Sequence, residues 1–186
     1  MLTHTGTKTI TTDRLTLRRF TPADAQSAWR NWAGDARVQN DYNEPVYKTV
    51  EAAEKLLAGY IEAYEKPETY RWGVCLKDQP ENCTGQIAFY LVDSKNEFCE
   101  IEYCIGRAYQ NKGYITEAVR AVTAFGFETV GFNRIQVCCR RVNLPSKRVI
   151  EKCGFTYEGT LRQYFNHFGE FQDRLYYAML KEEYRK

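Results

Sequence analysis

The sequence contains no apolar run long enough to cross a membrane. Nowhere do about 18 apolar residues follow one another, the length that a transmembrane helix needs. The first segment, residues 1–11, is polar and rich in threonine and lacks the apolar stretch of a signal peptide. These absences predict a cytoplasmic protein that does not bind membranes, and we expect residues 1–11 to be poorly structured.

The sequence is also poor in residues that bind metals. It has only two histidines, His4 and His167, and its seven cysteines include no C-x-x-C pair. Zinc sites use histidine and cysteine at short, regular spacings, so we expect no metal site. The odd number of cysteines argues against a disulfide framework.

The formal charge is nearly balanced, at +2. A nucleic-acid-binding domain carries a strongly basic surface, so the composition gives no support for that class of partner. With 186 residues, of which 44% are hydrophobic, the chain is long enough to bury one core, and we expect a single domain over residues 1–186. The sequence leaves open whether the chain forms a homodimer.

Apolar periodicity predicts an α/β (α+β) fold, because a period of two marks strands and a period near 3.6 marks helices. About seven strands are expected, near residues 15–19, 72–76, 84–92, 98–105, 135–139, 157–165 and 171–180. About four helices are expected, over residues 22–33, 49–67, 115–128 and 143–154, and residues 35–48 are irregular or a short helix. A helical crossover between the strands at 98–105 and 135–139 predicts a central parallel pair in a mostly antiparallel sheet.

The most informative stretch runs from residue 100 to residue 128. An alternating strand is followed by a turn that contains Gly113 and then by an amphipathic helix. The first N–H groups of a helix lack intrahelical partners and carry positive partial charge, so the turn is a candidate phosphate site, with Lys112 adding charge. It is neither a P-loop nor a dinucleotide motif, because Gly113 is the only glycine in the turn. Alternatively, Gly113 only makes the turn.

The pattern Gln110-x-x-Gly113-x-Ile115 resembles motif A of the Gcn5-related N-acetyltransferase (GNAT) family, although Ile115 stands where the family has a small residue. Asn143-x-x-Ser146, followed by residues 149–155, resembles the family's second signature, particularly in the branch of ribosomal-protein N-terminal acetyltransferases. Three further segments, 12–18, 100–103 and 114–118, are similar to that branch. The resemblance covers residues 12–181.

This resemblance implies acetyl-CoA as the cosubstrate. The turn would hold the pyrophosphate, and the strand at Tyr103 and Ile105 would hold the thioester. Asn143 would contact the pantetheine arm, and Arg148 would contact the 3′-phosphate. The implied cofactor-binding residues are Tyr103, Ile105, Gln110, Asn111, Lys112, Gly113, Tyr114, Ile115, Thr116, Asn143, Ser146 and Arg148. Two of these residues have other interpretations: Asn143 can cap a helix, and Arg148 can be an arginine exposed to solvent.

Acetyl transfer to an amine needs a base for the amine and an acid for the departing thiolate. Glu100 and Glu102 share one strand face; Glu100 is the expected base, because it matches the branch's Glu-Ile-x-Tyr segment, and Glu102 is the alternative. Ser146 is the expected acid, because Ile150 replaces the tyrosine that many family members use, with a water as the alternative. A solvent-facing role is the competing interpretation for either carboxylate.

The resemblance implies a primary amine as the acceptor, with the N-terminal amine of a ribosomal protein as the leading candidate. Acidity agrees with this choice, since an α-amino group is about 10–20% neutral at pH 7 and a lysine below about 0.1%. The alternatives are a small amine, such as a polyamine or an amino sugar, and a non-catalytic regulatory module that binds CoA.

Overall fold

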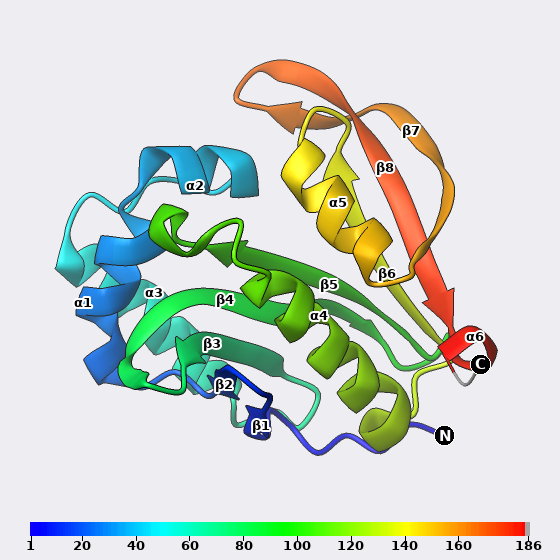
Figure 1. Cartoon of the computed structure of the whole chain (residues 1–186), viewed down its shortest axis with the longest axis horizontal. Coiled ribbons are helices and arrows are strands. Elements are labelled where there is room, and N and C mark those ends of the chain that lie inside the picture. The colour runs from blue at the N-terminus through cyan, green and yellow to red at the C-terminus, as the bar shows by residue number, and fades with distance from the viewer. Residues whose placement is uncertain (185–186) are drawn as a thin grey trace.

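The computed structural model describes residues 1–184, which form one eight-stranded sheet in the order β1-β2-β3-β4-β5-β6-β8-β7 (Figure 1). The strands are β1 (Ile10–Thr11), β2 (Leu15–Arg18), β3 (Tyr70–Leu76), β4 (Gln79–Asp93), β5 (Phe98–Ile105), β6 (Arg134–Arg140), β7 (Thr156–His167) and β8 (Glu170–Leu180). Only β5 and β6 run parallel, and the other neighbours are antiparallel. The predicted fold class is confirmed.

Six α-helices lie in the described part of the chain, together with four short helical turns (Figure 1). The α-helices are α1 (Ala25–Ala28), α2 (Ala36–Tyr42), α3 (Val50–Ala63), α4 (Tyr114–Phe125), α5 (Leu144–Lys152) and α6 (Lys181–Tyr184). The turns are η1 (Pro22–Asp24), η2 (Trp29–Ala33), η3 (Arg107–Tyr109) and η4 (Gly126–Val130). The helix expected over residues 22–33 is present as η1, α1 and η2 together. None of the helices in residues 1–184 is both long and apolar enough to span a membrane.

The eighth strand comes from the N-terminal segment, which we expected to be poorly structured. Ile10 and Thr11 pair with Leu17 and Thr16 of β2. Earlier in the segment, the Thr3 N–H donates to the Val130 carbonyl at 2.9 Å, and other groups of residues 1–11 bond to β3 and its approach. The segment is ordered because its polar groups bond to distant parts of the fold rather than to solvent.

Two helical layers cover the two faces of the sheet. On one face, α4 and α5 pack against every strand from β2 to β6 and against β8, with Ala118, Val122 and Ile150 fully buried. On the other face, α1, η2 and α3 pack over the β2–β5 side, around Trp32 and Leu57. Within residues 1–184 the helices of this layer do not pack on β6, β8 and β7, where the same face carries Gln136, Arg174 and Tyr176.

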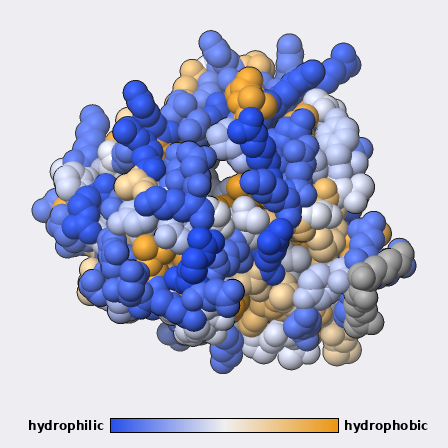
Figure 2. Space-filling view, viewed as in Figure 1, coloured by the Kyte–Doolittle hydropathy of each residue, from blue (hydrophilic) through white to orange (hydrophobic). Residues whose placement is uncertain are grey.

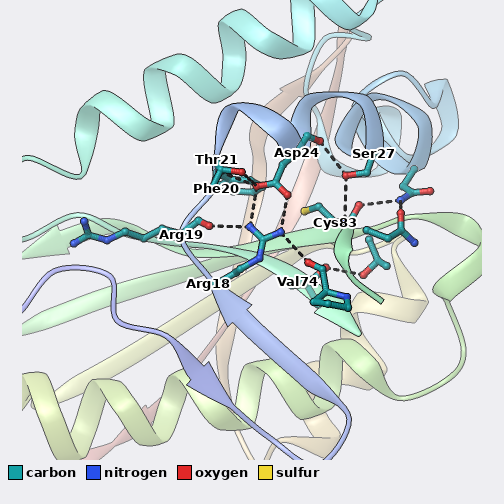
Figure 3. Close-up of polar contacts among 12 residues, drawn as sticks. Arg18, Arg19, Phe20, Thr21, Asp24, Ser27, Val74 and Cys83 are labelled. Carbon is teal, nitrogen blue, oxygen red and sulfur yellow. Dashed lines mark hydrogen bonds and ion pairs between the residues drawn. The ribbon is translucent and has the colours of Figure 1, made fainter. Parts of the chain in front are cut away.

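A buried ion pair fixes the first helical segment to the sheet (Figure 3). Arg18 of β2 donates two hydrogen bonds to Asp24, at 2.8 and 2.6 Å, and Asp24 also accepts from the Thr21 N–H at 2.7 Å. The Ser27 hydroxyl accepts from the Cys83 N–H of β4 at 3.1 Å. Burial raises the pKa of Asp24, but the hydrogen bonds from Arg18 and Thr21 outweigh it, so the net pKa lies below 3.8.

The parallel ladder between β5 and β6 is short. It pairs four residues on each strand and ends at Ile101 and Val137, although β5 continues to Ile105 and β6 to Arg140. Beyond that point β6 keeps its pairing with β8, and β5 keeps its pairing with β4. We call the place where residues 102–105 and 138–140 diverge the strand gap. Every predicted catalytic residue lies at or near it.

Candidate functional site

The turn before α4 has the geometry of an anion site. Gly113 adopts φ 80° and Asn111 φ 60°, the left-handed region that glycine tolerates without strain. The first bond of the helix runs from the Glu117 N–H to the Gly113 carbonyl at 3.0 Å, so the N–H groups of the preceding turn are outside the helical ladder. Asn111, Lys112 and Gly113 are exposed. These features fit the pyrophosphate of a CoA ester.

Ile115 does not cover this turn. Its side chain is 7% exposed and packs into the core beneath α4. The departure from the small residue of motif A therefore changes the packing under the helix and leaves the face of the turn open. Tyr114 lies beside the turn with the Arg14 guanidinium 4.7 Å from its ring centre.

A polar strut that sequence analysis did not assign supports the turn from the segment between β1 and β2. Glu117 accepts from the Arg14 Nε at 2.7 Å, from the Arg14 N–H at 2.9 Å and from the Thr12 hydroxyl at 2.6 Å. Arg14 Nη1 in turn donates to the Lys112 carbonyl at 2.9 Å. The signal was present, since both partners lie in segments that resemble the acetyltransferase branch, but no spacing rule joins residues 103 positions apart.

Two hydroxyl groups meet on the α5 side of the strand gap. The Tyr103 hydroxyl lies 2.8 Å from the Ser146 Oγ, and Asn143 Oδ1 caps the helix by accepting from the Ser146 N–H at 3.1 Å. Burial raises the pKa of Tyr103 well above its ordinary 10.0, so the phenol is protonated at neutral pH. Ile150 is fully buried in the core and is not part of the gap.

Glu100 is buried in a closed set of partners. Its side chain lies on the face opposite α4, and the residue is 1% exposed. Oε2 accepts from Gln136 at 2.7 Å, and Oε1 accepts from the Cys138 thiol at 2.9 Å and from Arg174 at 3.4 Å. Both carboxylate oxygens are therefore engaged by neighbours on β6 and β8.

Glu102 lies on the same face but at the strand gap, one residue past the end of the ladder. Its Oε1 accepts from Arg71 at 2.7 Å, whereas its Oε2 has no hydrogen-bond partner in residues 1–184. The side chain is 23% exposed. Arg71 also binds Gln86 and lies 4.2 Å from the Tyr60 ring centre, so it holds Glu102 in place.

A polar contact that sequence analysis did not identify joins β6 to α2 beyond the gap. Arg140 Nη2 donates to Asp41 at 3.1 Å, and Arg140 Nη1 lies 2.8 Å from the His167 Nε2. His167 Nδ1 lies 2.9 Å from Asn43 Oδ1, which brings the β7–β8 hairpin against the end of α2. We call Arg140, Asp41, His167 and Asn43 the latch.

A pocket of about 480 Å³ lies between α2 and η3, next to the latch. Asp41 of the latch lines it on one side and Gln110, the first residue of the turn motif, on the other. Gln110 also donates to the Ile105 carbonyl at 3.2 Å. The molecular surface is hollowed near the centre of the face shown in Figure 2, between the α2 side and the α5 side.

The remaining predicted binding residues do not line the strand gap. Arg148 is exposed on α5, and Lys112 extends over the Tyr109 ring, 5.8 Å from its centre. Thr116 lies in the first turn of α4, where its carbonyl accepts from the Cys153 thiol at 3.6 Å. The structure thus brings the Tyr103 and Ser146 hydroxyls together at the gap and places Glu102 beside the gap on the opposite face of β5, with Glu100 more deeply buried and Arg148 on the surface.

Comparisons with known proteins agree with this geometry. The family model described as "Acetyltransferase (GNAT) domain" matches residues 14–156. The chain is 32% identical to the uncharacterized N-acetyltransferase YnaD of Bacillus subtilis over 176 residues, which are 94% of this chain and 98% of YnaD. A crystal structure of a GNAT-family acetyltransferase from Bacillus anthracis matches with a TM-score of 0.81 and 30% identity, covering 95% of this chain and 100% of that one.

A further solved structure is RimL, a ribosomal L7/L12 alpha-N-protein acetyltransferase in complex with coenzyme A. It matches with a TM-score of 0.83 at 18% identity, covering 95% of this chain and 99% of RimL, and at that identity the likeness concerns the fold alone. The family model and the YnaD match are stronger, because they rest on sequence over most of the chain. They confirm the resemblance to the GNAT family. The chain belongs to the GNAT acetyltransferase family.

Proposed function

We propose that this protein transfers the acetyl group of acetyl-CoA directly to the N-terminal amine of a protein, with a ribosomal protein as the leading acceptor. The observation that carries the proposal is the juxtaposition of an exposed anion-binding turn at Gly113 with a strand gap that contains a hydroxyl pair and a carboxylate. A CoA ester needs the first feature for its phosphates, and acetyl transfer needs the second for its protons.

The donor would bind on the α4 and α5 side. The turn N–H groups and Lys112 would bind the pyrophosphate. Asn143 and the strand at Tyr103 and Ile105 would bind the pantetheine arm and the thioester. Arg148 would bind the 3′-phosphate. Support comes from the exposure of the turn and from the burial of Ile115 away from it. RimL, which shares the fold, binds coenzyme A.

In the chemical step, the neutral amine attacks the thioester carbonyl, so that a C–N bond forms and the C–S bond breaks. The departing thiolate needs a proton, and we assign this role to the Ser146 hydroxyl, which lies 2.8 Å from the Tyr103 hydroxyl. The attacking nitrogen loses a proton at the same time. Glu102 is the better acceptor for it than Glu100, because Glu102 Oε2 is free of partners in residues 1–184 and Glu100 is buried and fully bonded.

Two facts support an α-amine as the acceptor. The neutral fraction of an α-amine at pH 7 exceeds that of a lysine by a factor of about 400, so a single modest base is enough. The fold is also that of RimL, whose name describes acetylation of a protein α-amine.

The acceptor is tested by following CoA thiol release with a panel of acceptors. We expect release with ribosomal proteins that carry a free N-terminus and a much lower rate with polyamines and amino sugars. Mass spectrometry of the product peptide locates the acetyl group on the α-nitrogen. Release with a polyamine and none with any protein would transfer the assignment to small amines.

The donor site is tested separately with Gly113→Glu, which places a side chain and a negative charge where the phosphates would bind. We expect acetyl-CoA binding to be lost in calorimetry. Gly159→Glu is the matched control, because nothing lies within 4 Å of a Cβ built at Gly159 on β7. An unchanged affinity of Gly113→Glu would reject the turn as the phosphate site.

A further inference from the structure

A continuous series of hydrogen bonds leads from the end of α2 to Glu102. Arg71 of β3 donates through Nη2 to Glu102 Oε1 at 2.7 Å and through Nη1 to Gln86 Oε1. Gln86 of β4 donates in turn through Nε2 to the Tyr42 hydroxyl oxygen at 2.6 Å. We call Tyr42, Gln86 and Arg71 the brace. It joins α2, β4 and β3 to the carboxylate on β5, and sequence analysis assigned a role to none of its members.

The chemistry of the three side chains fixes the direction of each bond in the brace. Arginine only donates, so the Gln86 amide must present its oxygen to Arg71, and its nitrogen then faces Tyr42. Burial raises the pKa of Tyr42 well above its ordinary value, so the hydroxyl stays neutral at pH 7. Gln86 is fully buried, so it cannot exchange either partner for water without a cost.

Other contacts hold both ends of the brace. The Arg71 guanidinium lies 4.2 Å from the centre of the Tyr60 ring on α3. At the other end, Tyr42 is the last residue of α2, and its chain neighbours Asp41 and Asn43 both belong to the latch. The β7–β8 hairpin therefore helps to fix the position of Tyr42.

The orientation of Glu102 depends on this support. Within residues 1–184 its carboxylate bonds only to Arg71, through Oε1, and the side chain is 23% exposed. Several rotatable bonds separate the carboxylate from the backbone, so without a fixed Arg71 it would turn among several rotamers. A displacement of about 1 Å at a reacting group can lower a rate about a hundredfold.

We propose that Gln86 and Tyr42 are positioning residues for Glu102, because they hold the Arg71 guanidinium so that the second Glu102 oxygen faces the acceptor nitrogen. This inference rests on the proposed acetyl transfer and on Glu102 as its base. Gln86 and Tyr42 act through Arg71 and need no contact with a substrate. Their loss should slow proton transfer and leave the binding of acetyl-CoA unchanged.

The test uses two variants and a matched control. Tyr42→Phe removes one hydroxyl, and Gln86→Leu removes both amide bonds at similar volume. We expect kcat to fall about threefold to tenfold in Tyr42→Phe and about tenfold to thirtyfold in Gln86→Leu, with the acetyl-CoA dissociation constant within about twofold of wild type. Tyr47→Phe is the control and should resemble wild type, because Tyr47 lies in the loop after α2 and bonds Trp29 through its backbone carbonyl at 3.0 Å.

Each substitution is also made in the Glu102→Gln enzyme, which separates positioning from a general effect on the fold. Once the carboxylate is gone there is no base to position, so we expect Tyr42→Phe and Gln86→Leu to lower the residual kcat by less than about twofold. A further loss as large as in the wild-type background would show that both residues act through the fold and would overturn the inference. Full kcat in both single variants, or a loss of acetyl-CoA affinity, would also overturn it.

The failures of the two proposals are distinguishable. If the wild-type enzyme released no CoA with any amine, the proposed function would fail, and the inference with it. If the wild type were active and Glu102→Gln kept full kcat, acetyl transfer would stand and the inference would be overturned. If Gln86→Leu did not fold, as judged by circular dichroism, Tyr42→Phe would decide, because it leaves Arg71 bonded to Gln86 and Glu102.

Discussion

Tyr103 and Ser146 place their hydroxyl oxygens 2.8 Å apart although 43 positions separate them in the chain. One residue lies on β5 and the other in the first turn of α5, so the contact joins the two sides of the strand gap. Burial raises the pKa of Tyr103, and its proton is therefore available to the pair across the neutral pH range. In the proposed reaction Ser146 gives its proton to the thiolate and takes the Tyr103 proton, and the phenolate so formed takes a proton from water before the next turnover.

We expect Ser146→Ala and Tyr103→Phe each to lower kcat about tenfold to a hundredfold, because each removes one hydroxyl of a proton-donating pair. The kcat of the double variant should be little lower than that of the less active single variant, since the two groups act as a unit. Acetyl-CoA affinity, measured by calorimetry, should stay within about threefold of wild type. Tyr157→Phe is the control, because Tyr157 forms an exposed hydroxyl pair with Thr160 at 2.6 Å. Additive losses in the double variant would contradict the pairing.

The two carboxylates on β5 should respond differently to removal of their charge. We expect Glu102→Gln to lower kcat by about a hundredfold, because it removes the proton acceptor. Glu100→Gln should change kcat much less and lose about 1–3 kcal/mol of unfolding free energy, because an amide N–H would then face the donors Gln136, Cys138 and Arg174. A loss of kcat confined to Glu100→Gln would return the role of base to Glu100.

The strut beneath the turn should matter for donor binding. Glu117→Gln leaves the helix intact but weakens the bonds to Thr12 and Arg14, and Arg14 holds the Lys112 carbonyl. We expect the acetyl-CoA dissociation constant to rise about tenfold, as expected when a supporting polar contact is lost. Glu151→Gln on α5 is the control, since its only ion pair within residues 1–184 is an exposed one with Lys147 at 3.7 Å. Unchanged binding in Glu117→Gln would show that the turn holds its shape without the strut.

The Arg18–Asp24 pair should make stability depend on pH. The pKa of Asp24 is lower in the folded chain than its ordinary 3.8, so the pair stabilises the fold above that value and loses its effect as pH falls through the folded pKa. We expect Asp24→Asn to lose about 3 kcal/mol at pH 7, as for one partner removed from a buried pair, and the loss to shrink below about pH 4. Urea unfolding at several pH values measures it. Asp78→Asn, at an exposed turn, should show no such trend.

Local patterns in the sequence predicted most of the helices and strands. Alternation in residues 98–105 and helical spacing after Gly113 placed β5 and α4, and the crossover rule placed the parallel pair. The strand β1 was missed, because two residues without alternation carry no periodic signal. The gap between the strands expected at residues 72–76 and 84–92 was too long, because the turn occupies only residues 77–78 and β4 already begins at Gln79.

The candidate site likewise contains residues that the sequence could predict and residues that it could not. Residues that belong to contiguous motifs, such as Gln110, Gly113 and Ser146, could be named from the sequence. The latch and the strut could not, because Arg140 meets Asp41 across 99 positions and Arg14 meets Glu117 across 103. The order of Glu100 and Glu102 likewise depends on burial, which alternation along a strand does not reveal.

The short ladder between β5 and β6 has a mechanical consequence. Four residue pairs join the two halves of the sheet there, against eight between β4 and β5 and seven between β6 and β8. Opening fluctuations of the sheet should concentrate along this seam, because fewer inter-strand pairs resist them there than between β4 and β5 or between β6 and β8. A bound molecule that contacts both halves should reduce these fluctuations. Its binding would then be measured as slower deuterium uptake by the backbone amides of β5 and β6, before any acetyl transfer.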